Sequence, residues 1–387
     1  MKKCFGTMFI LGICLFMVEA AGQTIETVSG VRVVHNVKGG TWGENPKIGL
    51  ELIRTIGGPD EKDENLAFGS PYDLVRDSAG NLYCLDVRNC QIQKLGADGK
   101  YLKTIGRRGQ GPGEFQSPFS MDIDEDGNLF VSDMMGRKIE VFNSDGKPLN
   151  SIRFESFARE FRRLKSRQFV RGGALMLRDL MAGGRKLPKL LTVVDRDDRV
   201  KKTFGEATDF KNVNVNSTAN SFSFEKDAEE NIVLGFWYQN RVEKYSADGT
   251  LIWQADRPLN FGTDVIDPGS FESDEKGSSR TAPQMNMVSI GIAADPVGRV
   301  WVNAYNRQMS REEQGGSILV GGQIRSRTEP KIQKMDIYKL EVYGPDGVLF
   351  GEIPLNHLAH GIRIFGDMLF LWERNNAIYY QYRIVEK

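Results

Sequence analysis

Each of six segments of this sequence has an arginine in the turn between two expected strands, and a guanidinium group in every segment would favour the binding of anions. The positions are Arg88, Arg137, Arg185, Arg241, Arg307 and Arg374. Asparagines accompany several of them, at Asn89, Asn240, Asn306 and Asn375. A guanidinium group presents a planar fork that pairs with carboxylates and phosphates. We therefore expect these side chains to share one face and to bind an anionic ligand, such as an acidic glycan or a peptide carboxylate.

Acidic side chains leave two other interpretations of these positions open. Asp86, Asp133 and Glu373 stand at strand ends that are equivalent to one another. Each of them could pair with an arginine of a neighbouring segment and so lock the segments together. Alternatively, the carboxylates could hold a divalent cation at the mouth of a central pore and serve a metal-dependent hydrolase or lyase.

Other catalytic chemistries find little support in the composition. The chain has 3 histidines, of which His357 and His360 share one loop, and two histidines without a third ligand are weak evidence for a zinc site. A serine or cysteine nucleophile needs a base and an orienting acid in contact with it, and no signature frames one here. We therefore expect a non-catalytic protein without a cofactor and keep the divalent-cation enzyme as the alternative.

An internal repeat supplies the elements that must position these residues. The segment that begins at Pro71 superimposes without a gap on the segment that begins at Pro118, a spacing of 47 residues. Alternating runs such as Leu129-Phe130-Val131-Ser132 are typical of short strands, and Asp-Gly dipeptides between them supply tight hairpin turns. A repeat of this length with four short strands predicts one blade of a β-propeller.

Weaker copies of the repeat complete a ring. They lie near residues 169–204, 227–249, 290–347 and 362–384. The last copy has three strands, and residues 52–57, a near copy of the fourth strand at 101–106, precede the first blade. We therefore predict an all-β, six-bladed β-propeller of four-stranded antiparallel blades, whose ring is closed by the N-terminal strand that completes the last blade. An insertion at about 308–335 interrupts the fifth blade and should project from the face of the rim loops.

The repeat motif resembles that of a known family. Asp-x-x-Gly-Asn-Leu followed by Asp-Gly-Lys, at Asp77–Lys100 and again at Asp124–Lys147, is similar to the NHL repeat. The linker Gly109-Gln110-Gly111-Pro112-Gly113-Glu114-Phe115 looks like one that bacterial exported six-bladed propellers of this class often carry. The resemblance implies the fold but no single activity, because related propellers serve as protein- or RNA-binding modules, as sensor ectodomains and, in a minority, as metal-dependent lyases or lactonases.

The N-terminus has the composition of a targeting segment. Lys2 and Lys3 precede an apolar run and then the small residues Ala20-Ala21-Gly22, which predicts a signal peptide over residues 1–22. We expect an extended arm over residues 23–47 and a single propeller domain over residues 48–387. No later stretch is suited to span a membrane.

Charge and targeting together define the expected partners. The 51 basic residues match the 51 acidic ones, so the net charge does not favour nucleic acid. We expect an exported protein, periplasmic or extracellular, that is a monomer. It should bind a glycan, a peptide or another protein through the rim loops of one face.

Overall fold

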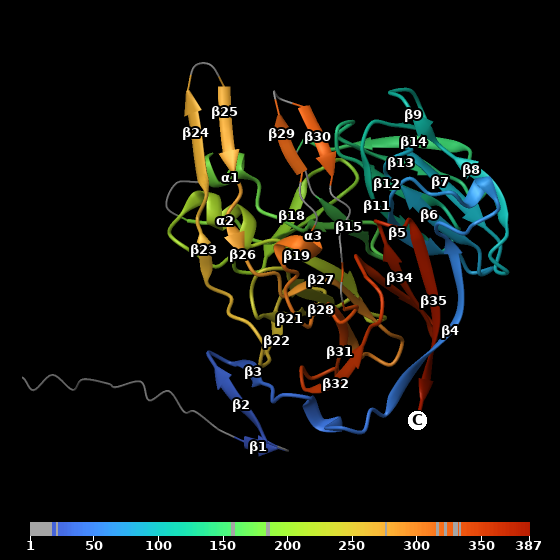
Figure 1. Cartoon of the computed structure of the whole chain (residues 1–387). Coiled ribbons are helices and arrows are strands. Elements are labelled where there is room, and N and C mark those ends of the chain that lie inside the picture. The colour runs from blue at the N-terminus through green and yellow to red at the C-terminus, as the bar shows by residue number, and fades with distance from the viewer. Residues whose placement is uncertain are drawn as a thin grey trace, which may run out of the picture.

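Six antiparallel sheets stand around a central axis in the computed structural model of this chain (Figure 1). The structure describes residues 18–387 except 21, 156–158, 183–185, 275–276, 315–316, 321–322, 328–331 and 333. Most of the predicted signal peptide, residues 1–17 and 21, therefore lies outside the described residues. The first strands of successive blades contact one another around the axis, so each blade runs from the axis outward.

The first three blades each consist of four consecutive strands. Blade 1 consists of β5 (Pro71–Arg76), β6 (Leu82–Asp86), β7 (Gln91–Leu95) and β8 (Tyr101–Ile105). Blade 2 consists of β11 (Pro118–Ile123), β12 (Leu129–Asp133), β13 (Lys138–Phe142) and β14 (Pro148–Arg153). Blade 3 consists of β15 (Glu160–Arg163), β16 (Phe169–Gly172), β17 (Leu191–Val194) and β18 (Val200–Phe204).

The last three blades are interrupted or completed by other parts of the chain. Blade 4 consists of β19 (Phe222–Lys226), β20 (Ile232–Phe236), β21 (Val242–Tyr245) and β22 (Leu251–Asp256). Blade 5 consists of β27 (Ser289–Ala294), β28 (Val300–Tyr305), β31 (Tyr338–Tyr343) and β32 (Leu349–Pro354). Blade 6 consists of β33 (Ile362–Phe365), β34 (Met368–Glu373), β35 (Ile378–Glu386) and β4 (Ile48–Gly57).

Tight turns fix the order of strands within each blade. In blade 1 the carboxylate of Asp77 accepts a hydrogen bond of 2.8 Å from the backbone N–H of Asn81, and Gly80 between them has a φ of 89°. Glycine adopts that backbone conformation without steric cost. These turns lie on one face of the disc, which we call the turn face. The connections between blades and the turns between second and third strands lie on the other, which we call the linker face.

Cationic side chains on outer strands cap these turns across blade boundaries. Lys103 of blade 1 donates to the backbone carbonyl of Asp145 in blade 2 at 3.0 Å. Arg54 on β4 in blade 6 donates to the carbonyl of Ala97 in blade 1 at 2.8 Å. Neighbouring blades are thus joined at the turn face by these contacts, in addition to the apolar clusters that fill the space between them.

Strand β4 completes blade 6 from the other end of the chain. It pairs antiparallel with β35 from Gly57 opposite Ile378 to Ile48 opposite Glu386, and Ile56 is buried in the resulting sheet. This is the partner that the sequence predicts for residues 50–57. The pairing places the N-terminal and C-terminal parts of the propeller in one sheet.

The residues before β4 add a hairpin to blade 4. They form β1 (Val18–Ala20), β2 (Gln23–Val28) and β3 (Val31–His35). Strand β3 pairs in parallel with β22, so the sheet of blade 4 has seven strands. The sequence predicts only an extended arm over residues 23–47. The pairing of β3 with β22 could not be predicted, because neighbouring residues do not indicate a pairing partner that is distant in the sequence.

The connections carry the remaining short elements. They are η1 (Gly40–Trp42), η2 (Glu64–Leu66), β9 (Arg107–Arg108), β10 (Glu114–Phe115), α1 (Leu177–Ala182), α2 (Val213–Ala219), β23 (Val265–Asp267), β24 (Ser270–Asp274), β25 (Gly277–Thr281), β26 (Gln284–Met285), α3 (Arg311–Gln314), β29 (Ser317–Val320) and β30 (Gln323–Arg327). The insertion predicted at 308–335 holds α3 and the hairpin β29–β30, and Figure 1 shows this hairpin and β24–β25 extending from the same side. No described helix is long and apolar enough to cross a membrane.

Removal of β4 should cause aggregation. A chain that begins at Gly58 leaves β35 with an unpaired edge, and an exposed edge pairs readily with other chains. We expect this variant to elute as soluble aggregates in size-exclusion chromatography with light scattering. A chain that begins at Lys47 also lacks β3 beside β22 but keeps β4, so it should aggregate less than the chain that begins at Gly58. A monodisperse, fully folded chain that begins at Gly58 would show that β4 is dispensable.

Attachment of the N-terminal hairpin should weaken as pH rises. The ring of His35 on β3 lies 2.7 Å from the carboxylate of Asp256 and 3.4 Å from that of Glu26. Burial opposes protonation of His35, but Asp256 and Glu26 outweigh it and raise the pKa of His35 above its ordinary value. A raised pKa in the folded state contributes stability that is fully present below the unfolded pKa and is lost as pH rises through the folded pKa.

The substitution His35→Gln isolates this contribution. The wild type should melt at a higher temperature than the variant at pH 5.5, and the two should converge at pH 8. The difference should stay below about 1 kcal/mol, because the side chain is partly exposed. A difference that is the same at both pH values would mean that the protonated imidazole does not hold the hairpin.

Candidate functional site

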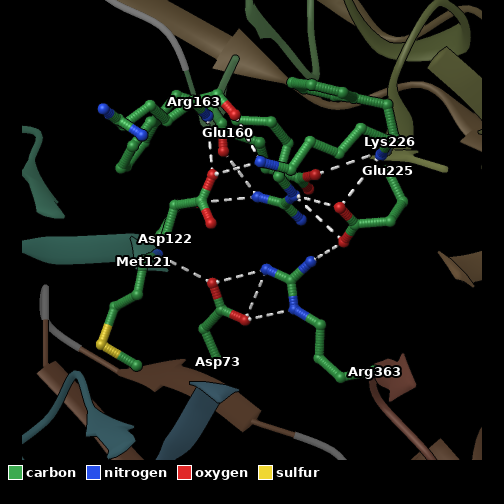
Figure 2. A network of polar contacts seen from close by, with 12 residues as sticks. Asp73, Met121, Asp122, Glu160, Arg163, Glu225, Lys226 and Arg363 are labelled. Carbon is green, nitrogen blue, oxygen red and sulfur yellow. Dashed lines mark hydrogen bonds and ion pairs between the residues drawn. The ribbon is translucent and has the colours of Figure 1, made fainter. Parts of the chain in front are cut away.

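A network of buried ion pairs closes the central axis. Arg363 on β33 donates three hydrogen bonds of 2.8 to 2.9 Å to the carboxylate of Asp73 on β5, and it also donates to Glu225 on β19 (Figure 2). Arg162 on β15 donates to both oxygens of Glu225, at 3.0 and 3.1 Å. The guanidinium groups outweigh the effect of burial and hold the pKa of Glu225 below its ordinary value. We call this set of side chains the plug.

Strand β11 joins the same network. The carboxylate of Asp122 accepts a hydrogen bond of 2.6 Å from the backbone N–H of Arg163 and lies 3.5 Å from Nζ of Lys226 (Figure 2). Asp73 also accepts from the backbone N–H of Met121 at 2.8 Å. Blades 1, 2, 3, 4 and 6 therefore contribute a charged side chain to the plug, whereas the corresponding part of blade 5 is Gly291-Ile292-Ala293.

A hollow of about 460 Å³, open to solvent, lies above the plug on the linker face. Its wall includes Tyr72, Phe119, Trp237, His360, Trp372 and Arg374. Asp73, Arg162 and Arg363 of the plug also border it. Trp237 and Arg374 follow the second strands of blades 4 and 6, which places the hollow on this face. A second cavity, lined largely by apolar side chains, lies on the opposite side of the plug.

Arginines and aromatic rings alternate along one wall of the hollow. The guanidinium of Arg159 lies 3.9 Å from the centre of the Trp237 ring and donates to the hydroxyl of Tyr72 at 3.4 Å. The rings of Tyr72 and Phe119 are 4.3 Å apart, and the guanidinium of Arg374 lies 4.2 Å from the Tyr72 ring. Such cation–π contacts hold both guanidinium groups against the wall.

One further residue shapes the opposite wall. A Cβ atom at Gly361 would come within 1.9 Å of the Trp372 ring, so the close approach of the two requires glycine at this position. His360 precedes Gly361, and its Nδ1 accepts a hydrogen bond of 3.2 Å from the backbone N–H of Arg374. Burial, together with the charge of Arg374, lowers the pKa of His360 to about 3, so its ring is neutral.

The predicted ring of arginines does not converge on a single site. Arg241 pairs with the buried Glu243 at 2.6 Å, and Arg307 pairs with Glu313 and Asp336 at 2.7 and 2.5 Å. Arg88 and Arg137 are exposed on the rim. Arg185 lies outside the described residues. Arg374 lines the hollow.

Asparagines beside these arginines bond mainly within the turns. Asn89 donates to Asp86 at 2.7 Å, Asn240 to the backbone carbonyl of Arg257 at 2.6 Å, and Asn306 to that of Asp336 at 2.9 Å. Asn375 is exposed. Three of the four amides thus hold loops of the linker face, and a role of the four in binding a ligand stays a prediction.

Acidic strand ends hold the linkers between blades. Asp86 accepts from the backbone N–H groups of Gly69 and Ser70 at 2.6 and 3.0 Å, and Asp133 accepts from those of Gln116 and Ser117 at 2.9 and 2.8 Å. Glu373 accepts from Asn376 at 2.7 Å and from Tyr380 at 3.2 Å. Within the part of the chain that the structure describes, no three His, Cys, Asp or Glu residues come close enough to hold a metal ion.

Sequence reasoning missed Arg159, Tyr72 and the plug. Tyr72 and Phe119 recur at the repeat spacing of 47 residues, so an aromatic pair at the start of the first strands was visible in the sequence. Charges within the first strands of diverged blades were visible as well. Their mutual pairing was not, because the repeat fixes the order of the blades but not the side-chain conformations that bring particular charges together at the axis.

Six four-stranded antiparallel blades around a closed axis define a six-bladed β-propeller. The chain belongs to the family DUF5128, described as a 6-bladed beta-propeller, whose model matches residues 62–289. No curated protein matches the chain.

Solved structures support the fold. A member of the DUF4221 family from Bacteroides vulgatus shares 12% identity, with 88% of this chain and 99% of that chain covered and a TM-score of 0.54. A protein from Bacteroides fragilis, provisionally named as exported, shares 10% identity over 92% of this chain and 99% of that chain, with a TM-score of 0.55. A virginiamycin B lyase from Staphylococcus aureus aligns at 9% identity over 94% of this chain and 89% of that chain, with a lower TM-score of 0.46.

Loss of Arg363 should destabilise the whole ring. The substitution Arg363→Gln leaves Asp73 without its cation and Glu225 with Arg162 alone, and breaking a buried pair commonly costs about 3–5 kcal/mol. Denaturant unfolding should report that loss. The substitution Arg383→Gln removes an exposed cation of the same blade and should cost less than about 1 kcal/mol. Equal, small effects of the two substitutions would mean that the plug contributes little to stability.

Proposed function

We propose that this protein is a non-catalytic, extracytoplasmic binding or scaffold protein of the NHL-repeat class, whose ligand binds on the linker face. Residues 1–22 would act as a signal peptide, and the mature chain would work in the periplasm or outside the cell as a monomer. The provisional name of the similar Bacteroides fragilis protein supports export. The ligand would be an anionic glycan, a peptide or an anionic surface of another protein.

One observation carries this proposal: the axis is blocked and the carboxylates in it are already paired. A general base needs a carboxylate or imidazole that can reach a substrate proton. Asp73 and Glu225 instead accept hydrogen bonds from Arg363 and Arg162. What remains accessible above them is an aromatic and cationic wall, which suits recognition of an anion better than its chemical conversion.

An enzyme acting at the mouth of the axis is the second candidate, because of one buried carboxyl group. Glu160 borders the hollow, and its burial raises its pKa although Arg162 and Arg159 lie near it. A carboxyl group with a raised pKa can act as a general acid. A metal-dependent variant of this enzyme would instead use a divalent cation at Asp86, Asp133 and Glu373 for the chemistry of a hydrolase or lyase.

A thermal-shift screen with paired compounds tests the binding proposal. Acidic oligosaccharides and peptides with free carboxylates should raise the melting temperature, whereas neutral analogues of matched size should not. A ligand present at 100 times its Kd stabilises the folded state by about 2.7 kcal/mol, which such a scan detects. EDTA should leave the shift unchanged.

The same compounds analysed for turnover test the alternative. Conversion of any of them that EDTA abolishes would replace the binding proposal by the metal-dependent enzyme. Conversion that resists EDTA and is lost in Glu160→Gln would instead assign general-acid chemistry to the hollow.

A further inference from the structure

We propose that the hollow on the linker face is a receptor for a carboxylate carried on a single ring, held by Arg159, Arg374 and Trp372. This inference rests on the proposed function and names the ligand chemistry at its site. A uronic acid and an aromatic acid both have this chemistry, and the experiment below separates them.

Unpartnered donors mark the position of the missing acceptor. Nε of Arg159, Nε of Arg374 and Nε1 of Trp372 are all buried, and none has a hydrogen-bond partner. Trp372 and Arg374 line the hollow, and Arg159 contacts two of its other walls, Tyr72 and Trp237. A buried N–H without an acceptor costs about 1–3 kcal/mol, and native proteins contain few of them. Three around one hollow point to an acceptor that the chain itself does not supply.

The balance of charge gives the sign of the ligand. In the plug, Arg363 and Arg162 pair with Asp73 and Glu225. Among the described residues, by contrast, no carboxylate forms an ion pair with Arg159 or Arg374. Glu160 borders the same hollow and is partly buried, and burial raises its pKa. The wall of the hollow therefore carries one to two positive charges without a counterion.

Geometry favours a planar anion with a flat body. Both guanidinium groups lie over aromatic rings. Each donates once from Nη2, Arg159 to the Tyr72 hydroxyl at 3.4 Å and Arg374 to the His360 carbonyl at 3.5 Å, and each has an Nε without a partner for a planar acceptor such as a carboxylate. Since the stack already fixes the side chains, little entropy is lost on binding. The hollow is shallow and open to solvent, so one ring of a ligand would lie against the aromatic wall with part of its surface in solvent.

Calorimetric titration with matched compounds tests the ligand class. We expect the wild type to bind glucuronate but not glucose, or benzoate but not benzyl alcohol, and whichever acid binds identifies the ring. Inorganic phosphate is the third arm and should bind more weakly than that acid.

Substitutions then locate the site. Arg159→Gln and Arg374→Gln should each weaken binding on the order of 10-fold or more, the loss expected for a hydrogen bond to a charged group. Trp372→Phe keeps an aromatic ring but removes the indole N–H and part of the ring volume, and it should weaken binding several-fold.

Arg108→Gln, at an exposed arginine of a linker on the same face, is the matched control and should leave affinity unchanged. Arg88→Gln tests the arginines that the sequence predicts as a site and should weaken binding only if they, and not the hollow, hold the acid. If Arg374→Gln does not fold, Arg374→Lys keeps a cation over Tyr72 but loses the Nε donor and should still weaken binding.

Each other outcome separates this inference from the proposed function. Suppose that an acid binds the Arg159 and Arg374 variants as tightly as the wild type, and that Arg88→Gln weakens this binding. The linker face then binds anions, and the hollow is not the site. Tighter binding of phosphate than of both acids overturns the carboxylate. If the folded wild type binds no acid of any size, peptide and oligosaccharide included, then the proposed function fails together with this inference.

Discussion

The pairing of Arg363 with Asp73 and Glu225 is the contact on which the rest of this molecule depends. It connects the first strands of blades 6, 1 and 4, which approach the axis from different directions. Because buried charges must be fully paired, the network tolerates little displacement of any of the three strands. Tyr72 and Ile362 flank these paired residues in the chain, so the same constraint sets the floor and one wall of the hollow.

Ionic contacts thus join the blades at two levels. The plug joins first strands at the axis, and the cations that cap turn-face carbonyls, such as Lys103 and Arg54, join outer strands at the rim. Apolar clusters fill the space between these levels and supply the area that is buried. Apolar packing tolerates small shifts between neighbouring sheets, whereas guanidinium–carboxylate pairs with two or more hydrogen bonds do not. The polar contacts therefore fix the angles between blades that packing leaves adjustable.

The sequence predicts the architecture well because repetition amplifies local signals. Turns such as Asp77–Asn81 and strand alternation recur in several copies, so the blades, their strand order and the partner of residues 50–57 all follow from internal comparison. Candidate site residues are harder to predict, because equivalent positions acquire different partners. Arg241 and Arg374 both lie in turns between second and third strands, yet Arg241 directly precedes β21 and pairs with Glu243, whereas Arg374 directly follows β34 and lies over the Tyr72 ring.

Pairing between β4 and β35 also has a consequence for the order of events as the chain is made. Some 320 residues separate the two strands, so the first strand of the ring waits for the last before it acquires its partner. Contacts between residues this distant in sequence form late and slowly. Blades 1 to 5 can assemble progressively as they emerge from the ribosome, but the plug lacks Arg363 until blade 6 is present. The ring therefore closes only when synthesis is almost finished, and an incomplete chain cannot form the native plug at the axis.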